Sequence, residues 1–181
     1  MKLPLSAVVL TMGLGLARVG HTEPTEAAAS APAPSTYVRE RERYLDDRRG
    51  FLSSLLLWGG ANVVMGLPLT ASSRDPFVQW VGAQTVAWGA VNSAIAIVGL
   101  ATTGSVRHDL GTLEAVAAER KSIQRFLWIN VAFDFAYATA GALLYGLGDD
   151  PGLRGNGAAI LGQGLFLVGF DLVGSFTQGP H

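Results

Sequence analysis

The chain has 181 residues, of which 49% are hydrophobic and only 15% charged, an unusually apolar balance for a soluble single domain. Its formal net charge of −1 argues against a nucleic-acid-binding protein, and the lack of cysteine excludes disulfides, thiolate nucleophiles and thiolate metal sites. The charged residues gather at 37–50, 74–75, 107–125 and 149–154, leaving four long apolar windows that predict a membrane protein.

The N-terminal residues 1–20 resemble a signal peptide, because Lys2 is followed by an apolar stretch up to Ala17 and then by Arg18. An uncleaved anchor helix is the alternative. Residues 21–36 are rich in Ala, Pro, Thr, Glu and Ser, and they hold too few large apolar groups to offset the entropy of ordering. We expect a disordered Ala/Pro-rich linker there.

Residues 37–50 alternate positive and negative charges at helical spacing, as in Glu40 and Arg43. This pattern predicts a solvated helix before the membrane, which we favour over a binding surface. Asp46 and Asp47 lie beside two arginines, so we expect no metal site there.

The four-transmembrane-helix domain should cover 51–177, with spans at about 51–70, 76–100, 123–147 and 157–176. Two short polar turns, around 74–75 and at 148–152, join the spans in pairs. The expected fold is therefore all-α: a membrane-embedded four-helix bundle made of two antiparallel helical hairpins. Residues 101–122 should form a short amphipathic helix at the membrane surface or extend the third span.

A five-residue pattern, Trp-Gly-x-x-Asn, occurs twice: at Trp58 to Asn62 and at Trp88 to Asn92. The two helices that carry it run in opposite directions, so we interpret it as a shared packing demand and not as an inverted transporter repeat. Trp58, Trp88 and Trp128 could also form an aromatic cage, although core packing is the favoured role.

Small residues at i,i+4 spacing should line the contacts between spans, because helices in lipid associate through close packing. The candidate packing residues are Ala83, Ala87, Ala90, Ala94, Ala132, Ala136, Ala140, Ala158 and Gly162.

Polar side chains inside the spans are the candidate functional residues, since such groups are costly in lipid and usually face a bundle interior. They are Asn62, Gln84, Asn92, Asn130, Asp134, Gln163 and Asp171. Their depth along each helix predicts three layers: Gln84 with Gln163, Asn62 with Asp134, and Asn92 with Asn130 and Asp171.

Two functions remain open for this polar set. It could be a clamp, in which amide and acid side chains fix the helix register through hydrogen bonds. It could instead be a proton or cation relay through Asp134 and Asp171. We favour the clamp, because no Lys or Arg lies at the depth of Asp134 and that acid is therefore expected to be protonated or hydrogen-bonded to an amide.

Catalytic signatures are absent from the sequence, including the serine nucleophile elbow, the His-Glu-x-x-His zinc motif and the phosphate-binding loop. No histidine lies in an apolar window, which excludes a bis-histidine haem. We therefore expect no enzyme, no cofactor and no metal. The expected partners are the lipid bilayer and a protein partner or a second copy of the chain, not nucleic acid.

Two signals conflict over orientation. Arginines before the first span and between the second and third spans place residue 50 in the cytoplasm, by the positive-inside rule. A cleaved signal peptide, or an anchor inserted with Lys2 inside, would place residue 50 outside. We favour the charge rule for the four spans.

Three motifs in the spans, Gln84-x-x-x-Trp88-Gly-x-x-Asn92, Asn130-x-x-x-Asp134 and Gln163-Gly-x-Phe-Leu-x-x-Phe-Asp171, carry a family resemblance. Over about 50–176 the chain resembles an uncharacterised family of small bacterial four-helix integral membrane proteins. The resemblance implies this architecture and a multi-pass protein of the bacterial plasma (inner) membrane, and it implies no mechanism. The expected function is thus a structural or interaction component of the membrane, with a small proton- or cation-coupled transporter or sensor as the alternative.

Overall fold

A computed structural model describes residues 34–179, all within one compact unit of the chain. This part of the chain forms helices and no strands, which confirms the all-α prediction. The helices are α1 (Pro34–Ser72), α2 (Pro76–Ala101), α3 (Thr103–Asp109), α4 (Leu113–Leu147) and α5 (Pro151–Thr177). The expected leader or anchor at 1–20, and the linker up to residue 33, lie outside the described residues.

Side-chain caps fix where three of the helices begin. Asp75 accepts a hydrogen bond from the Phe77 backbone N–H at 2.9 Å, and Pro76 occupies the first turn of α2. Asp150 accepts from Leu153 N–H at 3.1 Å ahead of Pro151. These caps make both hairpin turns only three residues long, so α5 begins six residues before the apolar window expected at 157–176.

For residues 101–122 the sequence allowed either a short helix or an extension of the third span, and the structure contains both. Helix α3 is a single short helix, and α4 begins at Leu113, ten residues before the third apolar window. Thr112 caps α4 by accepting from Ala115 N–H at 3.1 Å. The charged segment 37–50 likewise forms the first part of α1 and continues into the first apolar window without a break.

Helices α1, α2, α4 and α5 are long and apolar enough to cross a membrane. Large apolar side chains cover their outward faces; Leu57 and Leu147, for example, are about three-quarters exposed. Such exposure is unfavourable in water and normal against lipid. The chain is thus a multi-pass membrane protein.

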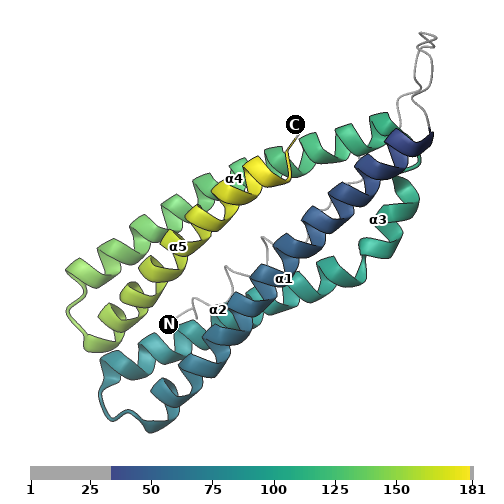
Figure 1. Ribbon diagram of the computed structural model, residues 1–181. Helices are drawn as coiled ribbons and strands as arrows, with labels where there is room; N and C mark the ends of the chain where they lie inside the picture. The colour runs from purple at the N-terminus through teal and green to yellow at the C-terminus, as the bar shows by residue number, and fades with distance from the viewer. Residues whose placement is uncertain (1–33, 180–181) are drawn as a thin grey trace, which may run out of the picture. The chain divides into compact units, whose positions relative to one another are not determined.

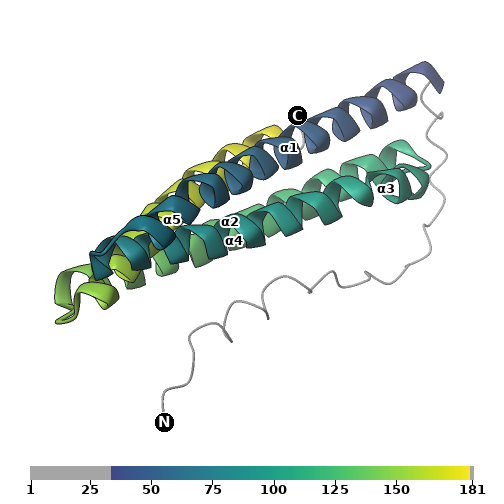
Figure 2. The same ribbon diagram turned by 90° about the horizontal axis from the view of Figure 1, so that it is seen from below.

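The spans form two antiparallel hairpins, as predicted: α1 with α2 and α4 with α5 (Figure 1). The hairpins contact each other mainly through α2 and α5. Both hairpin turns lie at one end of the bundle, and α3 lies at the other end in both views (Figure 2). We call the α3 side the charged end, because segments 37–50 and 107–125 meet there.

Glycines form the closest helix contacts. A Cβ atom on Gly89 would lie 2.6 Å from the Gly59 carbonyl oxygen across the first hairpin, and one on Gly164 would lie 2.8 Å from the Ala138 Cβ across the second. No glycine between residues 34 and 179 has a positive φ, so these glycines serve close approach and not an unusual backbone conformation.

At the charged end, α1 packs against α4 around a small cluster of buried side chains. Tyr44 and Leu45 are fully buried and pack against Val116. The buried Arg120 guanidinium contacts Asp47 at 3.0 Å and lies over the Tyr44 ring, 5.2 Å from its centroid. These contacts join the pre-membrane part of α1 to the start of α4.

Candidate functional site in the bundle interior

The first polar network lies between α1 and α5. Gln163 Nε2 donates a hydrogen bond to Asn62 Oδ1 at 2.5 Å, and Trp58 Nε1 donates to Gln163 Oε1 at 3.2 Å. Asn62 Nδ2 donates back to the Trp58 carbonyl at 2.8 Å. Asn62 and Gln163 are 2% and 5% exposed, so the bond between them lies in the buried centre of the bundle. Phe166 stacks on Trp58 with ring centroids 3.7 Å apart and covers the same contact.

A second network joins α2 to α4. The Tyr137 hydroxyl accepts hydrogen bonds from Trp88 Nε1 and, at 3.2 Å, from Gln84 Nε2. The Trp88 and Tyr137 rings meet edge to face, with centroids 4.9 Å apart. One hydroxyl therefore satisfies two half-buried donors from the other hairpin.

The third network contains the two intramembrane acids. The carboxyl groups of Asp134 on α4 and Asp171 on α5 lie close to each other, and Asn130 lies near Asp171. An ionised carboxylate has acceptors only, so two carboxyl groups can hydrogen-bond only when one of them carries a proton. The network joins α4 to α5 within the second hairpin.

Two interior polar atoms have no hydrogen-bond partner among the described residues: Asn92 Nδ2 and Asp134 Oδ2. Asn92 is only 3% exposed. Buried polar groups are normally satisfied, so these two atoms are the parts of the interior that the clamp alone leaves unexplained.

The predicted layers are only partly reproduced. Asn130 lies near Asp171, as their depths indicate, but Asn92 Nδ2 has no hydrogen-bond partner among the described residues. Asn62 pairs with Gln163 and not with Asp134, and the partner of Gln84 is Tyr137. Helical depth orders residues along the membrane normal, but it does not say which helix each side chain faces.

The repeated Trp-Gly-x-x-Asn pattern has the same packing role in α1 and α2. Gly59 and Gly89 pack against each other at the centre of the hairpin. The two tryptophans, one from each helix, each donate to a polar side chain of the second hairpin. Both asparagines are buried, although only Asn62 has its amide donor satisfied.

The candidate packing residues differ in how far they are buried. Ala83 and Ala158 are half-buried, and the other seven are exposed on the outward faces: Ala87, Ala90, Ala94, Ala132, Ala136, Ala140 and Gly162. A Cβ atom on Gly162 would meet nothing within 4 Å. Each of the three tryptophans considered as an aromatic cage packs against a different aromatic ring. The pairs are Trp58 with Phe166, Trp88 with Tyr137, and Trp128 with Phe176.

Tyr137 is the interior residue that the sequence analysis did not select. A lone tyrosine in an apolar window resembles an ordinary membrane aromatic, and only its place opposite two donors reveals its role. Among residues 34–179, no three His, Asp or Glu side chains gather closely enough to hold a metal ion.

One family model matches the chain over residues 54–172, and that family is described as a family of unknown function (DUF6992). The match runs from the first span to the end of the interior networks in α5. None of the curated proteins and none of the solved structures compared with the chain matches it.

Proposed function

We propose that this chain, which belongs to the family of unknown function DUF6992, is a structural or interaction component of the membrane. The observation that carries this proposal is the use of interior polar groups between the two hairpins. Trp58, Gln84 and Trp88 in the first hairpin each bond to Gln163 or Tyr137 in the second. These bonds fix how the hairpins dock, as a rigid scaffold requires.

We further propose that the protein is not an enzyme. The interior set consists of amides, two acids, a phenol and two indoles, and it holds no cysteine or histidine. Its hydroxyl, Tyr137, accepts from two donors and has no base beside it among the described contacts. A nucleophile needs such a base for activation.

The proposed setting is the bacterial plasma (inner) membrane, with the charged end in the cytoplasm. The charged end carries most of the Arg and Lys residues, which supports this orientation. A protein partner or a second copy of the chain would bind this bundle. The nearly neutral net charge argues against a nucleic-acid partner.

A second candidate function is proton- or cation-coupled transport or sensing. It is favoured by one specific observation: Asp134 and Asp171 lie close together on two membrane-spanning helices, and Asp134 Oδ2 has no hydrogen-bond partner among the described residues. Carboxyl pairs that exchange a proton are common relay elements in membranes.

Asp134→Asn and Asp171→Asn separate the two functions, because the amide can still donate a hydrogen bond to the remaining carboxyl group. For a clamp, we expect each variant to change the free energy of unfolding by about 0.6 kcal/mol or less. We also expect the protonated-carboxyl infrared band of the reconstituted wild type to stay constant across physiological pH. Asp109→Asn, at an exposed site, is the matched control.

A carboxyl band that titrates in the physiological range and disappears in Asp134→Asn or Asp171→Asn would overturn the clamp and support the relay. The same variants would then lose pH-dependent ion movement in vesicles while still inserting normally.

A further inference from the structure

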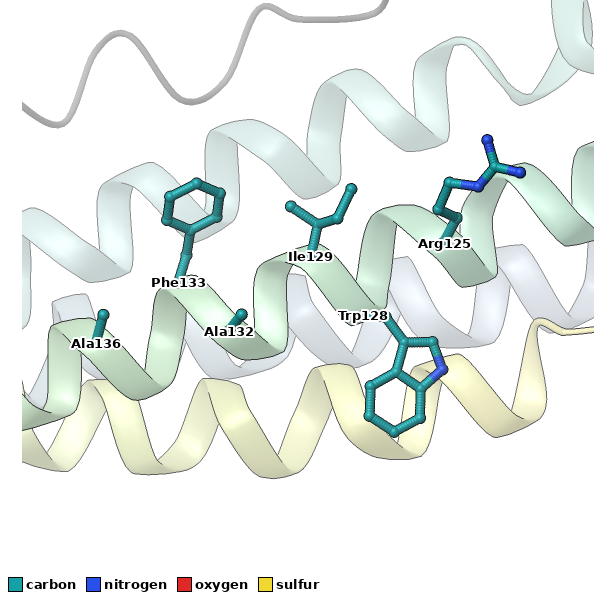
Figure 3. A pocket seen from close by; sticks show the side chains of 6 residues that line it. All are labelled: Arg125, Trp128, Ile129, Ala132, Phe133 and Ala136. Carbon is teal, nitrogen blue, oxygen red and sulfur yellow. The ribbon is translucent and has the colours of Figure 1, made fainter.

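An open groove runs along the outward face of α4, away from the interior networks. It has a volume of about 590 Å³ and is lined by Arg125, Trp128, Ile129, Ala132, Phe133 and Ala136 (Figure 3). Trp128 points towards α5, whereas Ile129 and Phe133 point to the opposite side. The short side chains of Ala132 and Ala136 line the rest of the groove.

Arg125 stands at the charged end of this groove and is its only charged lining residue. Its side chain is exposed and makes no hydrogen bond or ion pair with any residue in 34–179. It is also the last charged residue of α4 before Asp134, so its guanidinium lies where the apolar span begins. An arginine at this depth meets lipid headgroups.

The length of the groove matches one leaflet of a bilayer. Arg125 and Ala136 are eleven residues apart, which is about 16 Å along a helix. Half of a hydrocarbon core of about 30 Å is about 15 Å. A phosphate on Arg125 would therefore place an acyl chain along the whole groove, with its end at the middle of the membrane.

We propose that this groove binds one anionic phospholipid, with its phosphate on Arg125 and one acyl chain along Ala132 and Ala136. A guanidinium recognises phosphate oxygens through paired hydrogen bonds. A second copy of the chain fits less well, because a two-fold parallel dimer through this face would bring two Arg125 side chains together. The site lies on a different face from the interior networks and does not depend on the proposed function.

Native mass spectrometry of the full-length protein in detergent tests this site. The protein is mixed with equal amounts of phosphatidylglycerol and phosphatidylcholine that have identical acyl chains. We expect the wild type to retain phosphatidylglycerol at least about 5-fold over phosphatidylcholine. Arg125→Gln should abolish this preference, and Ala136→Phe, which fills the groove, should reduce retention of both lipids.

Two controls match these variants. Arg154→Gln removes an arginine at the opposite end of the bundle, and Ala142→Phe adds the same ring at an exposed position of α4 outside the groove. Both should bind lipid like the wild type. Helical content by circular dichroism and the melting temperature establish that each variant is folded.

Equal retention of the two lipids by the wild type, or an unchanged preference in Arg125→Gln, would overturn the proposal. A dimer mass that Ala136→Phe abolishes and Arg125→Gln leaves intact would assign the groove to a second copy of the chain, and would overturn it as well.

Discussion

Interior polar residues in this bundle work as partners across helices. Asn62 and Gln163 belong to different hairpins, as do Gln84 and Tyr137. Each such pair links the two hairpins at a fixed position along the helix axes. In lipid an unpaired polar group cannot form a hydrogen bond to water instead, so these contacts favour one helix register over the adjacent ones.

Tyr137→Phe tests the residue that satisfies two donors at once. Removal of the hydroxyl leaves Trp88 Nε1 and Gln84 Nε2 without their acceptor. We expect the free energy of unfolding to fall by about 1 kcal/mol, in the range of interhelical hydrogen bonds in membranes. Unfolding of the reconstituted protein in a denaturing-detergent titration gives this value.

Tyr145→Phe is the control for that measurement, because the Tyr145 hydroxyl makes no hydrogen bond with residues 34–179 and the side chain is 41% exposed. Its unfolding free energy should stay unchanged. Equal losses in the two variants would mean that the Tyr137 hydroxyl contributes nothing specific.

Sequence reasoning could identify which polar residues matter, because an amide or acid in an apolar window is informative by itself. It could not identify their partners. Asn62 lies at the depth of Asp134, yet its side chain faces Gln163 on α5. Rotation about each helix axis decides the partner, and neighbouring helices on either side are equally apolar.

At the scale of the helices, glycines form the closest contacts, whereas most of the alanines at i,i+4 spacing that the sequence singles out lie on outward faces. The alanine series at i,i+4 spacing defines a face of each helix, but hydropathy cannot tell whether that face meets a neighbour or lipid, since both are apolar. Gly59 and Gly89 lie where the backbones nearly touch. A pairwise comparison of small residues between helices could have found them, because they occupy the same place in the repeated Trp-Gly-x-x-Asn pattern.

Gly89→Ala should loosen the first hairpin. Its new Cβ atom would lie 2.6 Å from the Gly59 carbonyl oxygen, so the two backbones must separate. We expect a loss of about 1–3 kcal/mol in the free energy of unfolding, as for overpacking in a well-packed interior. The same denaturing-detergent titration measures it.

Gly60→Ala is the matched control, because a Cβ atom there meets nothing within 4 Å. Alanine also favours a helix over glycine, so this variant should be neutral or slightly stabilised. Destabilisation of Gly60→Ala as large as that of Gly89→Ala would contradict the close contact.

Arg120→Met tests the junction of α1 and α4 at the charged end. The guanidinium, only 5% exposed, would no longer pair with Asp47 or lie over the Tyr44 ring. Asp47 is partly exposed and can be hydrated once the arginine is removed. We therefore expect the free energy of unfolding to fall by about 2 kcal/mol, less than the ~3–5 kcal/mol lost when a fully buried pair is broken. Thermal unfolding of the reconstituted protein provides the comparison.

Arg39→Met, at an exposed position of the same charged end, is the control and should change the melting temperature little. A similar shift in both variants would show that net charge, and not the Arg120 contacts, stabilises this junction.

At the scale of the whole molecule, the two hairpins place both of their turns at one end and α3 at the other. The natural chain has no cysteine, so a single introduced thiol reports its own location. We expect Ser72→Cys and Asp149→Cys to react with a membrane-impermeant reagent from one side of the membrane. Ser105→Cys should react only from the other side, which the positive-inside rule identifies as the cytoplasm.

All three positions are exposed, so burial cannot prevent their labelling. Labelling of the Ser72 and Asp149 variants from opposite sides would contradict the two-hairpin arrangement. Labelling of the Ser105 variant from outside would leave the arrangement intact and reverse its orientation.

The number of spans and the hairpin turns could be predicted from the sequence, because helix length, Pro76, Pro151 and the capping acids act locally. The docking of the hairpins could not. It depends on contacts such as Trp58 on Phe166, between residues more than one hundred positions apart, and many pairs of apolar faces offer similar packing.

A double-mutant cycle between Asn62→Ala and Gln163→Ala tests most directly the claim that interior hydrogen bonds hold the two hairpins together. The free energy of unfolding is measured for the wild type, both single variants and the double variant. We predict a coupling energy of about 0.6–1.7 kcal/mol, because the two side chains bond to each other. Strict additivity of the two single losses would contradict the clamp.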